Sequence, residues 1–257
     1  FPDITNAYAW FTDKLQIVGP NAAPYTMPHL LDIDKDFESL VNSTIPEMGT
    51  GMSGLKVLVK EIDEDSIDVG SRLASAMADA KQYPGVPQLV LDNLTGEILN
   101  VVYENDKLYL KTLMSIHIDT CGETVETPLT IESDGTRRII EYMPLLYAVT
   151  RHDAVYIVDE VERSIHPILI KDIINKLSKS TDTKGQLIFT THESALLDQD
   201  IFRPDEIWFA QKDTDQATQL YPLSDFNIHK TANIENGYLN GRYGGIPFLS
   251  NLKDLHW

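Results

Sequence analysis

Two adjacent carboxylates, Asp159 and Glu160, directly follow a run of apolar, β-forming residues from Ala154 to Val158. Such a run predicts a strand that is buried on both faces, as the central strands of parallel sheets are. In open α/β sheets ligands bind beyond the carboxyl ends of the strands, so a carboxylate pair at that position can meet a metal-bound phosphate. Asp159 would then hold Mg²⁺ through water, and Glu160 would polarise the water that attacks a γ-phosphate. The residues fit equally well an ordinary core strand that ends in solvated acids.

A second candidate lies upstream, where a Ser-Asp-Gly-Thr turn (133–136) opens an apolar-striped helical pattern. A helix N-terminus combines free backbone N–H groups with the positive end of the helix dipole, so this turn can bind an anion. An ordinary helix N-cap explains the same residues, and caps are far commoner than phosphate sites. Pro144 lies inside the helical pattern, which predicts a kink or a new helix start about one turn earlier.

A histidine, His192, follows a second apolar run from Gln186 to Thr190. This run predicts another buried strand, and its carboxyl end would lie in the same crevice as Asp159. A neutral imidazole there can hydrogen-bond a γ-phosphate or the attacking water without competing with Mg²⁺. A surface cap is the alternative. Between the two strands, Pro167 fits the first turn of a helix whose apolar stripe comprises Ile170, Ile173, Ile174 and Leu177.

The remaining elements are expected to position these residues. Residues 1–84 are predicted to be mostly helical, beginning with Ile4, Tyr8, Phe11 and Leu15 at helical spacing. Residues 88–118 are rich in Val, Leu and Tyr and predict strands, with a hairpin turn at Glu104–Asp106. His117 lies within this apolar run and is interpreted as a core or rim histidine. A second hairpin is predicted around residues 213–216 and is expected to extend the sheet.

Composition and charge limit the possible classes of protein. The 257 residues suffice for a sizeable core, and a single cysteine, Cys121, excludes an internal disulfide framework and fits a reducing, cytoplasmic environment. No apolar run approaches the ~20 residues of a membrane span. The net charge of −18 argues against a broad nucleic-acid surface, although a local basic patch remains compatible with it.

Taken in order along the chain, these motifs resemble the second half of an ABC-type ATPase head, a P-loop NTPase fold with a mainly parallel sheet flanked by helices. More closely, they resemble the AAA-domain ATPases akin to the OLD family, many of which are bacterial or phage-defence proteins. The resemblance is strongest from about residue 125 to residue 247. The residues that carry it are Glu132–Arg138, Asp159-Glu160 with Ser164–Pro167, Phe189–His192, Asp205–Phe209 and Gly241–Gly244.

The resemblance implies a role for each matching position. The turn with Ser133, Gly135, Thr136 and Arg137 would be the signature turn, which meets the γ-phosphate of ATP bound by a second copy in a two-fold dimer. Asp159 would be the Walker B carboxylate for Mg²⁺, Glu160 the catalytic base and His192 the switch histidine. The loop with Ser164 and His166 would cross the dimer interface.

One departure from the family pattern concerns the Walker A loop. No GxxxxGK(S/T) motif occurs in the 257 residues, and the glycine-rich stretch Gly49–Gly54, which lacks the Lys-Ser/Thr pair, is expected to be a flexible turn. The family keeps the loop near its N-terminus, so we expect it upstream of Phe1 and expect this segment alone to be inactive. Residues 1–84 would then be an inserted arm, and residues 85–257 the head portion.

Three functions remain open at this point. The favoured one is an ATP-driven dimerising switch in phage defence, with an effector protein encoded elsewhere. The second is a non-catalytic interaction module that keeps the fold without nucleotide function. The third is a DNA-maintenance ABC ATPase, which ranks lower because residues 16–84 contain no coiled-coil heptads.

Overall fold

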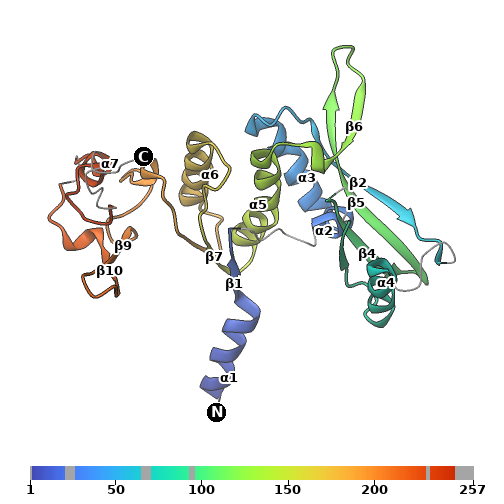
Figure 1. The fold of residues 1–257 in the computed structure, drawn as a ribbon, viewed down its shortest axis with the longest axis horizontal. Coiled ribbons are helices and arrows are strands. Elements are labelled where there is room, and N and C mark those ends of the chain that lie inside the picture. The colour runs from blue at the N-terminus through green and yellow to red at the C-terminus, as the bar shows by residue number, and fades with distance from the viewer. Residues whose placement is uncertain (1, 21–26, 65–70, 93–95, 230–231, 247–257) are drawn as a thin grey trace, which may run out of the picture. The chain divides into compact units, whose positions relative to one another are not determined.

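The structure is a computed structural model that describes residues 2–20, 27–64, 71–92, 96–229 and 232–246 (Figure 1). Its contacts divide the chain into two compact units. The first unit comprises residues 1–166 and 182–190, and the second comprises residues 167–181 and 191–257. Asp159, Glu160 and the Ser133–Arg137 turn therefore belong to the first unit, and His192 belongs to the second.

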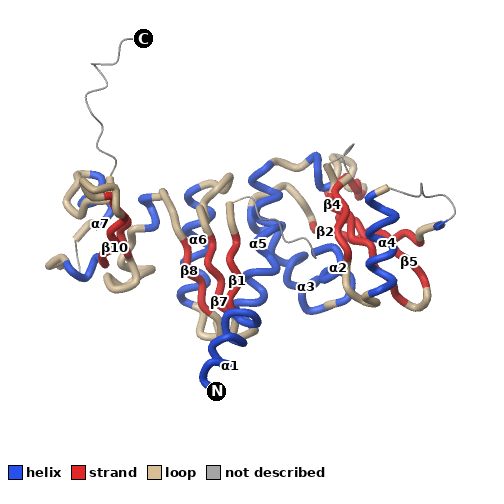
Figure 2. Tube along the Cα trace, turned by 60° about the horizontal axis from the view of Figure 1, so that its bottom comes forward, coloured by secondary structure: helices blue, strands red, loops and turns tan. Residues whose placement is uncertain are grey.

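A parallel sheet of the first unit carries the two predicted strand ends. Its strand order is β1 (Leu15–Val18), β7 (Val155–Val158) and β8 (Gln186–Phe189), and Figure 2 shows the three strands side by side. Val18 is paired in register with Val158, and Val158 with Phe189, so that all three strands end at one edge. Both predicted strands are present, and β7 is largely buried as predicted. The prediction that β8 is buried is wrong, because β8 lies at the edge of the described sheet and its residues are exposed or half-buried. Leu15, which the spacing assigns to a helix, instead begins strand β1.

A larger antiparallel sheet forms the other part of the first unit. Its strand order is β2 (Gly54–Glu61), β5 (Lys107–Ile118), β4 (Ile98–Glu104) and β3 (Gln88–Leu91), and β6 (Thr124–Pro128) also pairs with β5. Asn105 and Asp106 take φ values of 51° and 62°, as a tight β4–β5 hairpin turn requires, which confirms the predicted turn. The sequence indicates several of these strands, but it does not indicate that they form a sheet separate from the parallel one.

Helices of the first unit pack on both sheets. Ala76, Met77 and Ala80 of α4 form a core with Val90 and Val101 of the antiparallel sheet. Helices α3 and α5 meet through Phe37 and Tyr147, whose ring centroids lie 5.1 Å apart. The helical elements are α1 (Pro2–Ala9), a π-helical segment (Trp10–Lys14), α2 (Met27–Ile33), α3 (Lys35–Thr44), a 3₁₀ turn (Ile45–Met48), α4 (Arg72–Gln82), a 3₁₀ turn (Leu129–Ile131) and α5 (Asp134–Arg151).

Two local predictions concern helix α5 and the glycine-rich stretch. Helix α5 runs through Pro144 without a new start, so that alternative is wrong, and the kink stays a prediction. Gly49 and Gly51 have φ values of 67° and 75°, so the stretch before β2 is the turn that its glycines predict.

The second unit contains α6 (Pro167–Lys179), a 3₁₀ turn (Ser194–Leu196), strands β9 (Trp208–Lys212) and β10 (Thr218–Pro222), a further 3₁₀ turn (Leu223–Asp225) and α7 (Ile234–Leu239). Helix α6 begins at Pro167, as predicted. Phe209 stacks on Tyr238 and Tyr243, and Tyr243 is 1% exposed. The β9–β10 hairpin forms its own two-stranded sheet, so the expectation that it extends the parallel sheet is wrong.

The expected division at residue 84 does not coincide with the boundary between the two units. Residues 1–84 contain several helices, but β1 pairs with β7 and β2 pairs with β5, which ties this part of the chain to later strands. An inserted arm therefore stays a prediction. Among the helices that the structure describes, none is long and apolar enough to cross a membrane.

Candidate functional site

Thr190 joins the two candidate carboxylate residues at the carboxyl edge of the parallel sheet. Its hydroxyl donates to Oδ1 of Asp159 and accepts the backbone N–H of Glu160 at 2.9 Å. Its carbonyl accepts the N–H of Val161 at 3.1 Å, and the N–H of Asp159 donates to the carbonyl of Val18 at 2.9 Å. The ends of β1, β7 and β8 are thereby joined through the residues that follow β7. Sequence reasoning did not single out Thr190, although its position at the end of a neighbouring strand was a usable signal.

Glu160 takes a backbone conformation that glycine would favour. Its φ is 51°, in the left-handed region, which costs a non-glycine residue on the order of 1–3 kcal/mol. The hydrogen bond from its amide to Thr190 helps to hold this conformation. Such conformations concentrate at functional sites, because there the direction of a side chain matters more than local stability. The conformation therefore supports a role for the Glu160 side chain beyond that of a solvated acid.

The surroundings of the Asp159 carboxylate are compatible with a role as a magnesium ligand. Its side chain is exposed, and the bond from Thr190 occupies Oδ1 and leaves Oδ2 for a cation or its water. The described residues contain no group of three or more His, Cys, Asp or Glu that could hold a metal by itself. In proteins Mg²⁺ is usually bound by one or two carboxylates, with water and substrate phosphates as its other ligands. Asp159 can thus hold Mg²⁺ together with a phosphate.

The turn before α5 is a capped helix start with two open amides. The Ser133 hydroxyl accepts the N–H of Thr136 at 3.1 Å and lies 2.9 Å from the Thr136 hydroxyl. The N–H groups of Asp134 and Gly135 have no acceptor in the part of the chain that the structure describes. The N-cap is therefore present, and it leaves two donors of the first turn available for an oxyanion.

Gly135 brings this turn against the loop that follows β7. A Cβ atom at Gly135 would lie 2.8 Å from the carbonyl oxygen of Ser164, closer than real Cβ atoms come. Ser164 itself has a φ of 62°. Gly135 is thus a neighbour of Ser164, so two motifs that are separated by about thirty residues meet within one unit.

A buried tyrosine of α5 fixes the same loop. The Tyr142 hydroxyl donates to the Val161 carbonyl at 2.9 Å, and the Arg138 guanidinium lies 4.7 Å from the centroid of the Tyr142 ring. Burial raises the pKa of Tyr142, so the hydroxyl stays a neutral donor at physiological pH. Helix α5 therefore holds both ends of the segment from Val161 to Ser164.

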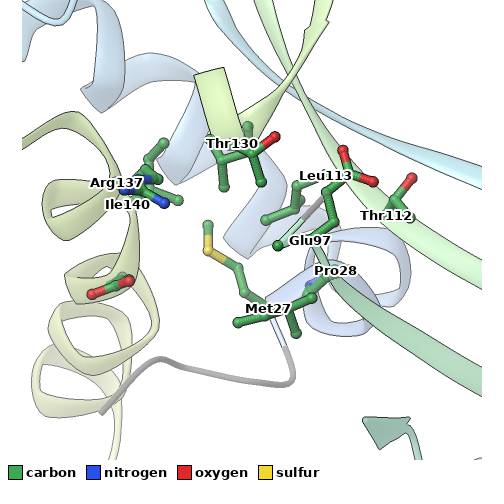
Figure 3. Close-up of a pocket in the computed structure, with 12 residues that line it drawn as sticks. Met27, Pro28, Glu97, Thr112, Leu113, Thr130, Arg137 and Ile140 are labelled. Carbon is green, nitrogen blue, oxygen red and sulfur yellow. The ribbon is translucent and has the colours of Figure 1, made fainter. Parts of the chain in front are cut away.

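The surroundings of Arg137 do not indicate a phosphate contact. Its guanidinium pairs with Asp134, and its side chain lines a cavity of about 110 Å³ among α5, α2 and the antiparallel sheet (Figure 3). Pockets for drug-sized ligands have about 300–1,000 Å³, so this cavity is too small for a nucleotide. Met27, Thr130 and Ile140 line it as well. Nucleotide binding by Arg137 stays a prediction.

Two further predicted residues lie outside this arrangement. His192 is exposed and belongs to the second unit, so its role as a switch stays a prediction. His166 is exposed and is the last residue of its segment of the first unit. Its position at a dimer interface also stays a prediction.

A parallel sheet flanked by helices, with an Asp-Glu pair at its carboxyl edge, is the arrangement of a P-loop-like nucleotide-binding domain. Residues 29–198, about two-thirds of the chain, match the family model described as "AAA domain, putative AbiEii toxin, Type IV TA system". The chain belongs to this family, and its domain is of the ATPase type that generally uses ATP and Mg²⁺. No curated protein matches the chain.

Proposed function

We propose that the chain is part of an ABC-class ATPase that binds ATP and Mg²⁺ between two copies of the protein, so that the nucleotide controls dimerisation. The observation that carries this proposal is the Thr190 hydroxyl, which joins the Asp159 carboxylate to the Glu160 amide at the carboxyl edge of a parallel sheet. The membership in an AAA-domain family supports the nucleotide-dependent part. The dimer rests on the resemblance to ABC-type heads.

Each residue has a separate task in this proposal. Asp159 holds Mg²⁺, which supplies positive charge at the β- and γ-phosphates. Glu160 orients the attacking water and accepts its proton on the carboxylate. The amides of Asp134 and Gly135 donate to the γ-phosphate of a nucleotide that the second copy holds, which stabilises charge that develops there. His192 contacts the same phosphate, and the loop with Ser164 and His166 faces the second copy.

The phosphate-cradling loop is assigned to a part of the protein outside residues 1–257. Such a loop supplies most direct phosphate contacts, so the 257 residues alone are expected to bind ATP weakly and to hydrolyse none. The proposal therefore concerns the full-length protein, and its tests use that protein.

The biological role proposed is anti-phage defence through a separate effector protein. The support is the resemblance to OLD-like defence ATPases and the family description, which names a putative toxin of a toxin–antitoxin system. The expected result is that cells carrying the gene survive phage infection better than cells carrying its Glu160→Gln variant. Equal survival of both, with the variant protein present and folded, would contradict this role.

Glu160→Gln tests the enzymatic part in the full-length protein. The change removes the base and keeps the size of the side chain, so ATP turnover should fall by about 10²–10⁴-fold. Asp153→Asn is the matched control, because it makes the same charge change before β7 and breaks only an exposed ion pair with Lys14. Unchanged turnover in Glu160→Gln would show that the assigned base is wrong. No turnover in the unmodified protein would favour the non-catalytic module.

A further inference from the structure

His117 lies between two hydrogen-bond acceptors from different parts of the first unit. Its Nε2 is 2.7 Å from Oε1 of Glu132, and its Nδ1 is 3.2 Å from the carbonyl oxygen of Gly51. Glu132 is the residue immediately before Ser133, the N-cap of α5, and Gly51 lies in the turn before β2. The imidazole of strand β5 therefore spans from the antiparallel sheet to the start of α5.

The chemistry of this contact is defined by its two partners. Both partners are acceptors, because a carboxylate and a backbone carbonyl accept hydrogen bonds and donate none. Glu132 faces the ring from the turn before α5, and Gly51 faces it from the loop before β2. The register partner on β6 is Val125, which is apolar. A hydrogen bond that a carboxylate accepts is charge-assisted, which is the stronger kind.

The Glu132 side chain is well placed to fix the turn. It is 11% exposed, and its backbone N–H donates to the Leu129 carbonyl at 3.1 Å. Glu132 and Ser133 are both extended, with ψ values of 156° and 154°, and this conformation aims the first amides of α5. Gly135 packs on Ser164 from one side of the turn, and His117 anchors Glu132 just before it.

We propose that His117 is a positioning residue: through Glu132 it fixes the direction of the Asp134 and Gly135 amides toward the γ-phosphate. The inference rests on the proposed function, because it assigns these amides to the phosphate. A histidine in an apolar run otherwise reads as a core or rim residue, and the sequence gives no sign that Glu132, fifteen residues away, is its partner.

Two substitutions distinguish the contact that Nε2 makes with Glu132 from the contact that Nδ1 makes with Gly51. In His117→Gln the amide nitrogen reaches the place of Nε2 and can donate to Glu132. In His117→Asn the amide nitrogen reaches only the place of Nδ1 and can donate to Gly51. The two variants remove the same ring and leave a similar polar group, so they form a matched pair.

The test measures steady-state ATP turnover of the full-length protein and its two variants. We expect His117→Gln to retain turnover within about twofold, and His117→Asn to lose about tenfold or more in kcat with little change in KM for ATP. The turn acts on the phosphate in the assembled dimer, so initial ATP binding should be little affected. Glu132→Ala should lower kcat as much as His117→Asn does. The double variant, Glu132→Ala with His117→Asn, should have a kcat no lower than that of Glu132→Ala alone. Equal turnover of both histidine variants, whether high or low, would overturn the inference.

Hydrogen exchange of the full-length protein, without nucleotide, gives a readout that does not depend on ATPase activity. The N–H groups of Thr136 and Arg137 donate to the hydroxyl and the carbonyl of Ser133, so their exchange reports the geometry of the turn. They should exchange faster in His117→Asn than in His117→Gln. If the unmodified full-length protein turns over no ATP, the proposed function fails, and equal exchange in the two variants would separately overturn the positioning role.

Discussion

Thr190 shows how a residue with no reactive role can organise two carboxylates. One hydroxyl contacts the side chain of Asp159 and the amide of Glu160, and Glu160 holds a left-handed backbone conformation beside it. The spacing of Asp159 and Glu160 after an apolar run was sufficient to predict their position at the sheet edge. The contact with Thr190 was not predictable in the same way, because it joins residues about thirty positions apart.

Thr190→Val removes this hydroxyl and keeps the shape of the side chain. A hydrogen bond to a charged group is worth about 1.5–3 kcal/mol, and solvent exposure of Thr190 places the expected loss of stability at the lower end. ATP turnover of the full-length protein should fall at least tenfold, because Glu160 loses the group that fixes its amide. Urea unfolding and steady-state turnover measure the two effects.

Thr190→Ser is the matched control for this prediction, since it retains the hydroxyl and loses only a methyl group. It should keep turnover within a few fold of the unmodified protein. A Thr190→Val protein that hydrolyses ATP as fast as the serine variant would show that the bridge does not organise Glu160.

At the scale of elements, the start of α5 and the loop after β7 are held together by a glycine contact and a tyrosine hydrogen bond. Gly135 meets the Ser164 carbonyl, and Tyr142 donates to Val161. The Ser-Asp-Gly-Thr sequence was sufficient to predict a capped helix start. It does not indicate that Gly135 is required by the neighbouring loop, because the close approach arises only when the two elements pack.

Gly135→Ala should therefore destabilise the first unit. The new Cβ would lie 2.8 Å from a backbone oxygen that cannot rotate away, and overpacking of this kind costs roughly 1–3 kcal/mol. The higher helix propensity of alanine offsets up to about 1 kcal/mol of this cost. Gly19→Ala is the control, because a Cβ at Gly19 meets nothing within 4 Å. Equal urea midpoints for the two variants would contradict the contact.

A charged cluster around one buried lysine attaches α2 to the antiparallel sheet. Lys111 of β5 is 1% exposed, and its Nζ lies 2.8 Å from Asp32 Oδ2, 3.1 Å from Glu104 Oε1 and 3.2 Å from His29 Nδ1. Removing one partner from a buried ionic group leaves the others uncompensated. Lys111→Met should cost about 3 kcal/mol in urea unfolding, whereas Lys56→Met, which breaks an exposed pair with Glu126, should cost no more than about 1 kcal/mol. A Lys111→Met protein as stable as the Lys56→Met protein would exclude this role of the cluster.

His29 makes the stability of this cluster depend on pH. Burial, assisted by the charge of Lys111, lowers the pKa of His29 from its ordinary value of 6.5. The unfolded chain then binds a proton more readily than the folded one, so the stabilisation is fully present above about pH 6.5 and is lost as the pH falls through the folded pKa.

His29→Asn provides the comparison for this pH effect. Its amide oxygen can accept from Lys111 in the place of Nδ1, and it does not titrate. The urea midpoint of the unmodified protein should fall more steeply than that of the variant between about pH 7 and about pH 5. Parallel slopes for the two proteins would show that His29 does not contribute to the acid sensitivity.

At the scale of the whole molecule, local patterns and long-range pairing were not equally predictable. The apolar runs before Asp159 and Thr190 and the hairpin turn at Asn105 and Asp106 follow from neighbouring residues, and the structure contains them. The pairing of β2 with β5 joins residues that are about fifty to sixty positions apart in the chain. Strand β1 has only four residues, which are too few to be distinguished from the end of a helix. The separate antiparallel sheet was missed for this reason.

Membership in the AAA-domain family supports the ATPase type of the chain. The dimer that binds ATP between two copies is proposed in addition. Light scattering of the full-length Glu160→Gln protein with Mg²⁺ and saturating ATP tests that dimer most directly, because the variant should bind ATP without hydrolysing it. The variant should have the mass of a monomer without nucleotide and the mass of two copies with ATP. A mass that is the same with and without ATP, measured on protein shown to bind ATP, would contradict it.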